Sequence, residues 1–269
     1  MFLQIESNGP VQIWTIRRPN RGNGLGTTLA NELWAACQAL THPSATSAHE
    51  AIGALVLAAE LAGKPEAPVW VAGGDLKELG SIGAPGQGGD YALTMGKVCH
   101  FLSTAPLAVI AAVTGRAIGG GAELAMAADI RIGTFQATFE FRQFNMGLST
   151  GYGSAARLVG LIGKAKAQEC MYLQQVLDGA TCRTLGLLHD LAATSEKALE
   201  QAKAIAATLT GDQSAAFRAQ KVMFADAPGR GRNFPQGEID TFAAIWGNPA
   251  HQKALKSFGD SRAPSSSAK

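Results

Sequence analysis

The chain has 269 residues, is 46% hydrophobic and 16% charged, and carries a formal net charge of +2 at pH 7. This composition excludes an intrinsically disordered chain and allows one large core, with or without a small second domain. The small net charge, without any Lys/Arg run, excludes a dedicated nucleic-acid surface. No apolar stretch reaches membrane-spanning length, and the N-terminal MFLQIESNGP lacks a signal-peptide pattern. The widely spaced cysteines predict reduced core thiols rather than a metal site, so we expect a soluble cytoplasmic protein.

Strands and helices alternate in the first half of the sequence. Two short apolar runs at 2–6 and 11–17, separated by Asn8-Gly9-Pro10, predict a β-hairpin. The continuous apolar run at 53–59 is typical of a buried parallel strand. The other elements predicted here are helices from Thr27 or Thr28 to about Leu40, from Leu76, and over 91–102, and strands at 69–72, 107–113, 129–133 and 138–141.

The second half is predicted to be helical, with helices at about 152–159, 163–175, 195–209, 211–226, 236–247 and 249–258. An alternating first half and a helical second half indicate an α/β core followed by a helical module. We place the core at 1–200, the helical C-terminal region at 201–262 and a disordered tail at 263–269. The polar segment 42–50 is expected to be a loop, and the Gly/Pro-rich segment 80–89 is expected to be mobile.

Two glycine-rich turns stand where a strand leads into a helix. One is Gly73-Gly74-Asp75 and the other is Gly119-Gly120-Gly121. Backbone N–H groups at such turns can hold an anion, and two of them converging from separate turns form an oxyanion hole. Glycine suits this task because a ligand can approach the backbone closely. The alternative is a pair of tight turns without a ligand. Neither turn matches a dinucleotide-binding GxGxxG or a Walker A motif.

Glu123 is the only acid in the apolar helical segment that follows the second turn. A carboxyl group among Ala, Leu and Met side chains has its pKa raised by desolvation, and this poises it for proton transfer near neutral pH. The alternative is a carboxylate that only stabilises the positive end of the helix dipole. The apolar surroundings favour the catalytic interpretation.

The segment VTGRAIGGGAELAMAADIRI, followed by ATFEFRQFNMGLSTGYGSAARLVGLIGKAKA, closely resembles the signature of the crotonase (enoyl-CoA hydratase/isomerase) family. That signature runs roughly V-x-G-x-A-x-G-G-G-x-E-L-A-x-x-x-D and then A-x-F-x-x-P-E-x-x-x-G-x-x-P-G-x-G. Upstream, VAGGDLKEL resembles the family's A-G-x-D-L-K-E segment, and RRPNRGNGL resembles its R-P-x-x-x-N-A-L segment. The resemblance covers nearly the whole chain at matching spacings.

The resemblance implies a spiral of ββα repeats with a helical C-terminal region that forms a homotrimer, alone or as a dimer of trimers. The implied substrate is an acyl-CoA thioester, with coenzyme A as part of the substrate and no further cofactor or metal. Its carbonyl oxygen would be bound by the N–H groups of Gly74 and Gly120, and Glu123 matches the first catalytic glutamate of the hydratases. Gln143 takes the second catalytic position, and the neighbouring substrate-binding positions are Ala72, Gly119 and Gly151.

The sequence departs from the signature around the second catalytic position. The family's Pro-Glu pair is replaced by Arg142-Gln143, and its G-x-x-P-G run becomes GLSTG at 147–151. A glutamine can orient water or a carbonyl group but cannot exchange a proton, so we predict that Glu123 acts as both base and acid. Arg142 is a candidate partner for a substrate carboxylate. Candidate contacts for the CoA phosphates, each with a solvated side chain as its alternative, are Lys77, Lys221 and Lys253.

Three functions fit these residues. Hydration of a 2-enoyl-CoA with Glu123 as the single catalytic acid is the one we favour. Decarboxylation of a malonyl-type thioester, or another enolate reaction, is the second, because an oxyanion hole alone can stabilise an enolate. An acyl-CoA-binding protein without catalysis is the third. A family isomerase that needs the second glutamate is disfavoured by Gln143, and a dehalogenase is disfavoured because 144–157 contain no nucleophilic Asp.

Overall fold

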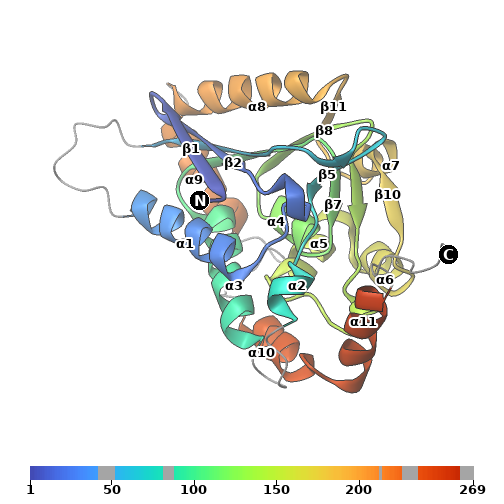
Figure 1. Ribbon diagram of the computed structural model, residues 1–269. Coiled ribbons are helices and arrows are strands. Elements are labelled where there is room, and N and C mark those ends of the chain that lie inside the picture. The colour runs from blue at the N-terminus through green and yellow to red at the C-terminus, as the bar shows by residue number, and fades with distance from the viewer. Residues whose placement is uncertain (42–51, 81–87, 212–213, 226–235, 261–269) are drawn as a thin grey trace.

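The computed structural model describes residues 1–41, 52–80, 88–211, 214–225 and 236–260, and Figure 1 shows the fold. The predicted loop at 42–50, the tail at 263–269 and all but the ends of the segment 80–89 lie outside these residues. Two sheets form the centre of the molecule, and helices cover them (Figure 1).

A six-stranded sheet is built mainly from the first half of the chain, in the strand order β1-β2-β3-β6-β8-β11. The predicted hairpin is confirmed, because β1 (Leu3–Asn8) and β2 (Val11–Ile16) pair antiparallel. All residues of β6 are buried, as its continuous apolar run predicts. The strands that follow the hairpin in parallel are β3 (Ala54–Ala59), β6 (Ala108–Val113), β8 (Ile130–Thr134) and β11 (Asp190–Ala192).

A second sheet has five strands in the order β10-β9-β7-β5-β4. Its strands are β4 (Ala62–Lys64), β5 (Ala67–Val71), β7 (Arg116–Ile118), β9 (Thr138–Glu140) and β10 (Val176–Asp178). The sequence predicts β9 but not β4, β7, β10 or β11, which are equally short. Three residues are too few to show a hydrophobic period reliably. The prediction of a wholly helical second half is therefore wrong, since β10 and β11 each extend one sheet.

Helices cover both sheets. α8 (Ser195–Thr210) lies along the first sheet, at the top of Figure 1, and buries three alanines against it. α3 (Gly89–Thr104) packs against both α1 (Thr27–Thr41) and α10 (Gln236–Ile245). The remaining helices are α2 (Leu76–Leu79), α4 (Gly120–Ala125), α5 (Ser154–Ile162), α6 (Lys164–Tyr172), α7 (Gly179–Thr184), α9 (Ser214–Ala225), α11 (Pro249–Asp260) and the short 3₁₀ turns η1 (Pro19–Arg21) and η2 (Phe144–Met146).

The C-terminal helices share the core of the N-terminal part. Ile239 and Phe242 of α10, with Trp246 after it, belong to the main buried hydrophobic cluster. The predicted boundary at residue 200 falls inside α8, which packs on the first sheet. The division into a core at 1–200 and a helical region at 201–262 therefore stays a prediction. The whole of α8 belongs with the sheets that it covers.

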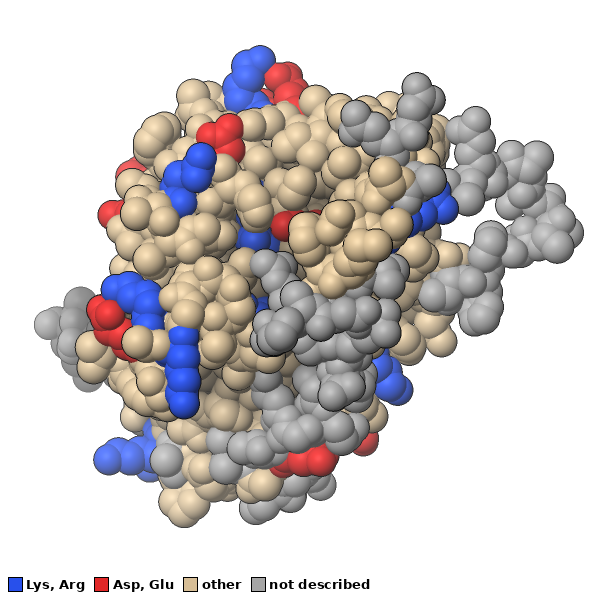
Figure 2. All heavy atoms as spheres, turned by 180° about the vertical axis from the view of Figure 1, so that it is seen from behind, with Lys and Arg blue, Asp and Glu red and all other residues tan. Residues whose placement is uncertain are grey.

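The surface carries few charges. On the face shown in Figure 2, Lys and Arg side chains lie singly or beside Asp and Glu rather than in one patch. Within the described ranges, no helix has the length and hydropathy that crossing a bilayer requires. All four cysteines are buried and none forms a disulfide. Burial raises the pKa of Cys182 to about 12, so its thiol stays protonated at neutral pH.

Lys221 of α9 is buried, and this corrects its prediction as a contact for CoA. Its Nζ donates to Asp129 Oδ2 at 2.8 Å and to the carbonyl oxygens of Leu102 and Leu107 at 3.0 and 2.9 Å. Burial lowers the pKa of Lys221 and raises that of Asp129. The pair ties α9 to the ends of α3 and β6. Lys77 and Lys253 are exposed and stay candidates.

Replacing Lys221 with Met is expected to lower the free energy of unfolding by about 3 kcal/mol, because the partly buried Asp129 loses its counter-charge and two carbonyl oxygens lose their donor. Urea denaturation at pH 7 measures the change. Lys203→Met, at an exposed position of α8, is the control and should change stability by less than about 0.5 kcal/mol. Equal losses in the two variants would contradict a stabilising role for the buried pair.

Candidate active site

The two glycine turns lie side by side because their strands do. β5 leads into Gly73-Gly74 and β7 leads into Gly119-Gly120, and the two strands are parallel neighbours. A Cβ on Gly73 would lie 2.6 Å from the Ile118 carbonyl oxygen and 2.9 Å from the Gly120 nitrogen. Gly73 also has a φ of +81°, so both its backbone conformation and this close approach require glycine. The structure thus brings Gly74 and Gly120 together.

The N–H groups of these two glycines are not used by the bridge at Gly74 or by the helix that begins at Gly120. Leu25 pairs with Gly74 in a parallel bridge, in which Leu25 N–H donates to Gly73 O and Asp75 N–H donates to Leu25 O. The neighbours of Gly74 make this bridge, so its own N–H points away from Leu25. Gly120 is the first residue of α4, where N–H groups have no partner within the helix. The prediction that these two N–H groups form an oxyanion hole is compatible with this arrangement.

Asp75 fixes the first turn through two arginines that the sequence analysis did not single out. Its carboxylate accepts from Arg21 Nη2 at 2.7 Å, lies 2.8 Å from Arg18 Nη2, and caps α2 by accepting from Lys77 and Glu78 N–H. Burial acts to raise the pKa of Asp75, but the Arg21 hydrogen bond, the cap and the two positive charges together lower it. The ionised carboxylate therefore holds the residue next to Gly74 in place. The arginines of the RRPNR sequence before the first helix are the feature of the sequence that could have indicated these partners of Asp75.

Asp75→Asn is expected to lower the free energy of unfolding at pH 7 by about 1–3 kcal/mol, because Arg21 loses its counter-charge and Arg18 keeps only its ion pair with Glu78. Since the pKa of Asp75 is lowered by folding, its stabilisation is present above the usual carboxyl range and is lost as the pH falls through the folded-state pKa. The difference between wild type and variant should therefore shrink below about pH 4. Denaturation at several pH values measures it, with the exposed helix cap Asp178→Asn as control. A difference independent of pH would contradict the ionic role.

Glu123 is buried but not in apolar surroundings, which corrects the prediction. Its Oε1 accepts from Gln143 Nε2 at 2.8 Å. Its Oε2 accepts from Ser154 Oγ at 2.7 Å and from the N–H groups of Tyr152 and Gly151 at 3.0 and 3.2 Å. These donors suit an ionised carboxylate. They come from the residue before η2, from the segment that follows η2 and from the start of α5, so the apolar neighbours of Glu123 within its own helix do not reveal them.

Gln143 is 6% exposed and turns its amide group to Glu123. Its Nε2 donates to the carboxylate, and its Oε1 is buried without a hydrogen-bond partner among the described residues. A buried amide oxygen is costly to leave unpaired, so this atom is ready to accept a hydrogen bond from a bound molecule. The structure therefore brings Gln143 and Glu123 together, as the sequence predicts.

At the predicted substrate-binding positions, the backbone N–H groups donate hydrogen bonds to other parts of the protein. Ala72 N–H donates to Gly22 O, and Gly119 N–H donates to Glu140 O. Gly151 N–H binds Glu123, so Gly151 positions the carboxylate. The Arg142 guanidinium donates to Glu140 Oε2 from Nε at 3.1 Å and from Nη2 at 2.9 Å. This contact holds Arg142 beside β9, and its pairing with a substrate carboxylate stays a prediction.

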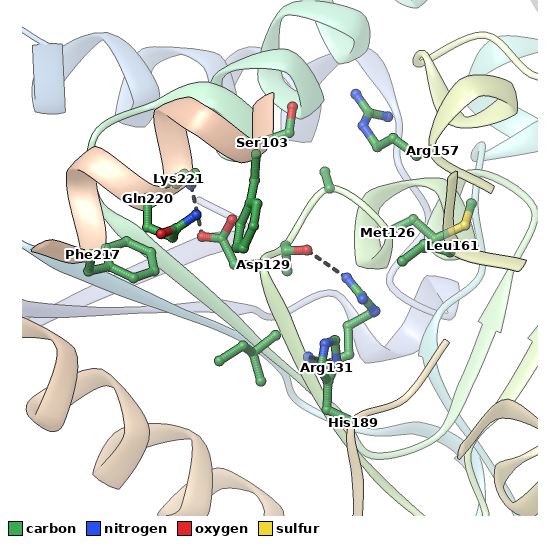
Figure 3. A pocket seen from close by; sticks show the side chains of 14 residues that line it. Ser103, Met126, Asp129, Arg131, Arg157, Leu161, His189, Phe217, Gln220 and Lys221 are labelled. Carbon is green, nitrogen blue, oxygen red and sulfur yellow. Dashed lines mark hydrogen bonds and ion pairs between the residues drawn. The ribbon is translucent and has the colours of Figure 1, made fainter. Parts of the chain in front are cut away.

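Two cavities lie apart from this site. One, of about 350 Å³, lies beyond the C-terminal end of α4, where Figure 3 shows the Lys221–Asp129 pair and Arg131 donating to the Ala128 carbonyl oxygen. The other, of about 310 Å³, lies between the first sheet and the start of α8. Neither cavity is lined by the glycine turns, Glu123 or Gln143, and of the predicted contacts only Lys221 lines the first one.

The chain is similar to known proteins over most of its length. The family model described as enoyl-CoA hydratase/isomerase matches residues 6–266. A probable enoyl-CoA hydratase of Rhizobium meliloti (strain 1021) is 35% identical over 213 residues, which cover 76% of this chain and 75% of that protein. An ethylmalonyl-CoA decarboxylase of Gallus gallus is 33% identical over 194 residues, covering 69% of this chain and 63% of that protein.

Solved structures share the fold. The crystal structure of an enoyl-CoA hydratase from Bacillus halodurans matches with a TM-score of 0.82 at 19% identity, covering 96% of this chain and 100% of that chain. One from Mycobacterium avium subsp. paratuberculosis K-10 matches with a TM-score of 0.78 at 21% identity, covering 100% and 99%. These matches confirm the predicted crotonase-like α/β fold.

Proposed function

Because the chain belongs to the enoyl-CoA hydratase/isomerase family, we propose that this acyl-CoA enzyme adds water to a 2-enoyl-CoA thioester. The observation that carries the proposal is the convergence of two backbone donors and one carboxylate. Gly74 and Gly120 lie at adjacent turns, and Glu123 follows Gly120 by three residues on the same short helix. Because Gly120 and Glu123 lie within one turn of the same helix, the donors and the acid would serve one substrate.

The two N–H groups would bind the thioester carbonyl oxygen. As a nucleophile adds to the β-carbon, negative charge develops on that oxygen and both hydrogen bonds strengthen. The site thus stabilises the enolate more than the bound substrate. The Arg18–Asp75–Arg21 ion pairs hold the Gly74 turn in place before the substrate arrives.

The attacking water would be held by Glu123 and Gln143. The two side chains are joined by a 2.8 Å hydrogen bond, so one water can donate to Oε1 of each. The water oxygen bonds to the β-carbon, and Glu123 takes one of the water protons. The same carboxylic acid then delivers that proton to the α-carbon, so the product gains the elements of one water. Gln143 orients the water and exchanges no proton.

Decarboxylation of a malonyl-type thioester is the second candidate. Its support is the similarity to an ethylmalonyl-CoA decarboxylase and the lack of a second proton-transfer group at Gln143. The hydrogen-bonding groups of the site argue against decarboxylation. The Glu123 carboxylate and the unpaired Gln143 Oε1 are both hydrogen-bond acceptors. A substrate carboxylate would be repelled there, whereas water or a hydroxyl group would be bound. Hydration therefore ranks first, and acyl-CoA binding without catalysis ranks third.

A panel of thioesters tests the proposal. Crotonyl-CoA, a 3-enoyl-CoA and ethylmalonyl-CoA are assayed in parallel for hydration, isomerisation and carbon dioxide release. We expect hydration of crotonyl-CoA to exceed the other two activities. Carbon dioxide release without hydration would establish the decarboxylase instead, and binding without turnover would establish the third candidate.

Three further properties remain proposals. The assembly as a homotrimer or a dimer of trimers is supported by exposed apolar side chains around α6 and β10, where the rings of Phe144 and Tyr172 stack with their centroids 5.5 Å apart. Leu173 and Val176 continue this surface and are 68% and 52% exposed. A requirement for no cofactor besides the CoA of the substrate and a cytoplasmic location rest on the sequence alone.

A further inference from the structure

We propose that Tyr152, supported by Tyr91, forms the end wall of the acyl pocket and restricts this enzyme to short acyl groups of about the length of a crotonyl group. The inference rests on the proposed function, because it assumes a thioester bound at Gly74 and Gly120. It assigns acyl-chain selection to two side chains that the sequence motifs do not identify.

The ring of Tyr152 lies on the catalytic face of α4. A Cβ added to Gly120 would lie 2.8 Å from Cε2 and 3.0 Å from the hydroxyl oxygen of Tyr152. Gly120 and Glu123 point to the same side of the helix, since they are three residues apart. A thioester bound by Gly120 N–H and reached by Glu123 therefore has the Tyr152 ring as its immediate neighbour.

Tyr91 of α3 extends this wall to the other glycine turn. Its hydroxyl oxygen lies 2.6 Å from that of Tyr152, and the two rings meet edge to face with centroids 6.0 Å apart. The same oxygen lies 3.9 Å from where a Cβ on Gly74 would be. The pair thus spans from Gly120 to Gly74, behind the atoms that react.

Both tyrosine hydroxyl groups donate hydrogen bonds within the protein, and both tyrosines are neutral, so the wall is rigid and uncharged. Tyr91 donates to the Leu25 carbonyl oxygen at 2.7 Å, and the proton between the two hydroxyls therefore belongs to Tyr152. Burial raises the pKa of both tyrosines, so both stay neutral. Each residue is at most 4% exposed. Moving either ring to admit a longer chain would break a buried hydrogen bond.

The wall and the catalytic acid can be separated by mutation. Tyr152 holds Glu123 through its backbone N–H and limits the pocket through its side chain. Tyr152→Ala removes the ring and keeps the N–H, whereas Tyr152→Phe keeps the ring and removes only the hydroxyl. Tyr172→Ala, which removes an exposed ring, is the control.

Calorimetric binding of saturated butyryl-, hexanoyl-, octanoyl- and decanoyl-CoA tests the proposal without requiring turnover. We expect the wild type to bind butyryl-CoA at least about tenfold more tightly than octanoyl-CoA. Tyr152→Ala should reduce this ratio at least about tenfold, and Tyr152→Phe and Tyr172→Ala should keep it. Thermal unfolding of each variant verifies that it is folded.

The outcomes separate this inference from the proposed function. Equal wild-type affinity for butyryl- and octanoyl-CoA, or an unchanged ratio in folded Tyr152→Ala, overturns the end wall and leaves acyl-CoA binding intact. Failure of the wild type to bind any of the four thioesters overturns both. Loss of the preference in Tyr152→Phe would also overturn a steric wall, because that variant retains the ring.

Discussion

Glu123→Gln is expected to lower kcat for the best enoyl-CoA substrate by at least about a hundredfold, because in the proposed mechanism Glu123 both takes the proton from water and delivers it to the α-carbon. Affinity for a saturated acyl-CoA should stay within about threefold, since the oxyanion donors of Gly74 and Gly120 are unchanged. The fold should also persist. The new amide oxygen can accept from Gly151, Tyr152 and Ser154, and Gln143 can turn its own oxygen to the new amide nitrogen.

Steady-state kinetics and calorimetry on the same preparation measure the two quantities. Glu169→Gln is the matched control, because Glu169 is an exposed acid paired with Lys166 on α6, away from the glycine turns. Its kcat should equal that of the wild type. A kcat for Glu123→Gln within threefold of wild type would show that another group transfers the proton, and the single-acid mechanism would then be wrong.

The glycine turns and the helix with Glu123 are predictable from sequence because each is local. A strand, a glycine turn and a helix lie within a dozen residues, and the motif fixes their order. The partners of Glu123 are not local, since Gln143 lies 20 residues away and Ser154 lies 31 residues away. Apolar neighbours at helical spacing describe one helix and say nothing of the segment packed on it. The prediction of apolar surroundings for Glu123 is therefore wrong, although the prediction of its place on the helix after the glycine turn is right.

The same distinction explains the other differences. The Arg18–Asp75 ion pair joins residues separated along the chain by a helix and three strands, and charge patterns in the sequence do not encode such a contact. The sequence around Lys221 is typical of an exposed lysine. Its partners, Asp129 and two carbonyl oxygens, come close to it only in the folded chain, so the sequence does not predict its burial. The strands of three residues form because neighbouring strands supply hydrogen-bond partners, and their own sequence shows no period.

Gln143→Glu is expected to raise the hydration rate near neutral pH by at least about tenfold, because it adds an acid at the second catalytic position. In the wild type Gln143 Nε2 lies 2.8 Å from Glu123 Oε1. Two carboxylates at that distance cannot both ionise, so they share one proton. One group can then activate water while the other protonates the α-carbon. The pH profile of kcat should become bell-shaped, with its two apparent pKa values set by the two coupled carboxyl groups.

A stability measurement shows whether the shared proton is present. Folding raises the apparent pKa of the carboxylate pair in Gln143→Glu, so stability relative to the wild type is retained at low pH and lost as the pH rises through that pKa. Gln143→Leu is the control, because it removes the amide that donates to Glu123 and supplies no acid, and its hydration rate should fall. If Gln143→Glu shows the pH-dependent stability but no gain in hydration, the pair forms and proton supply does not limit the natural enzyme. Such a result would favour decarboxylation, because loss of carbon dioxide forms the enolate without a base that removes a proton from water or carbon.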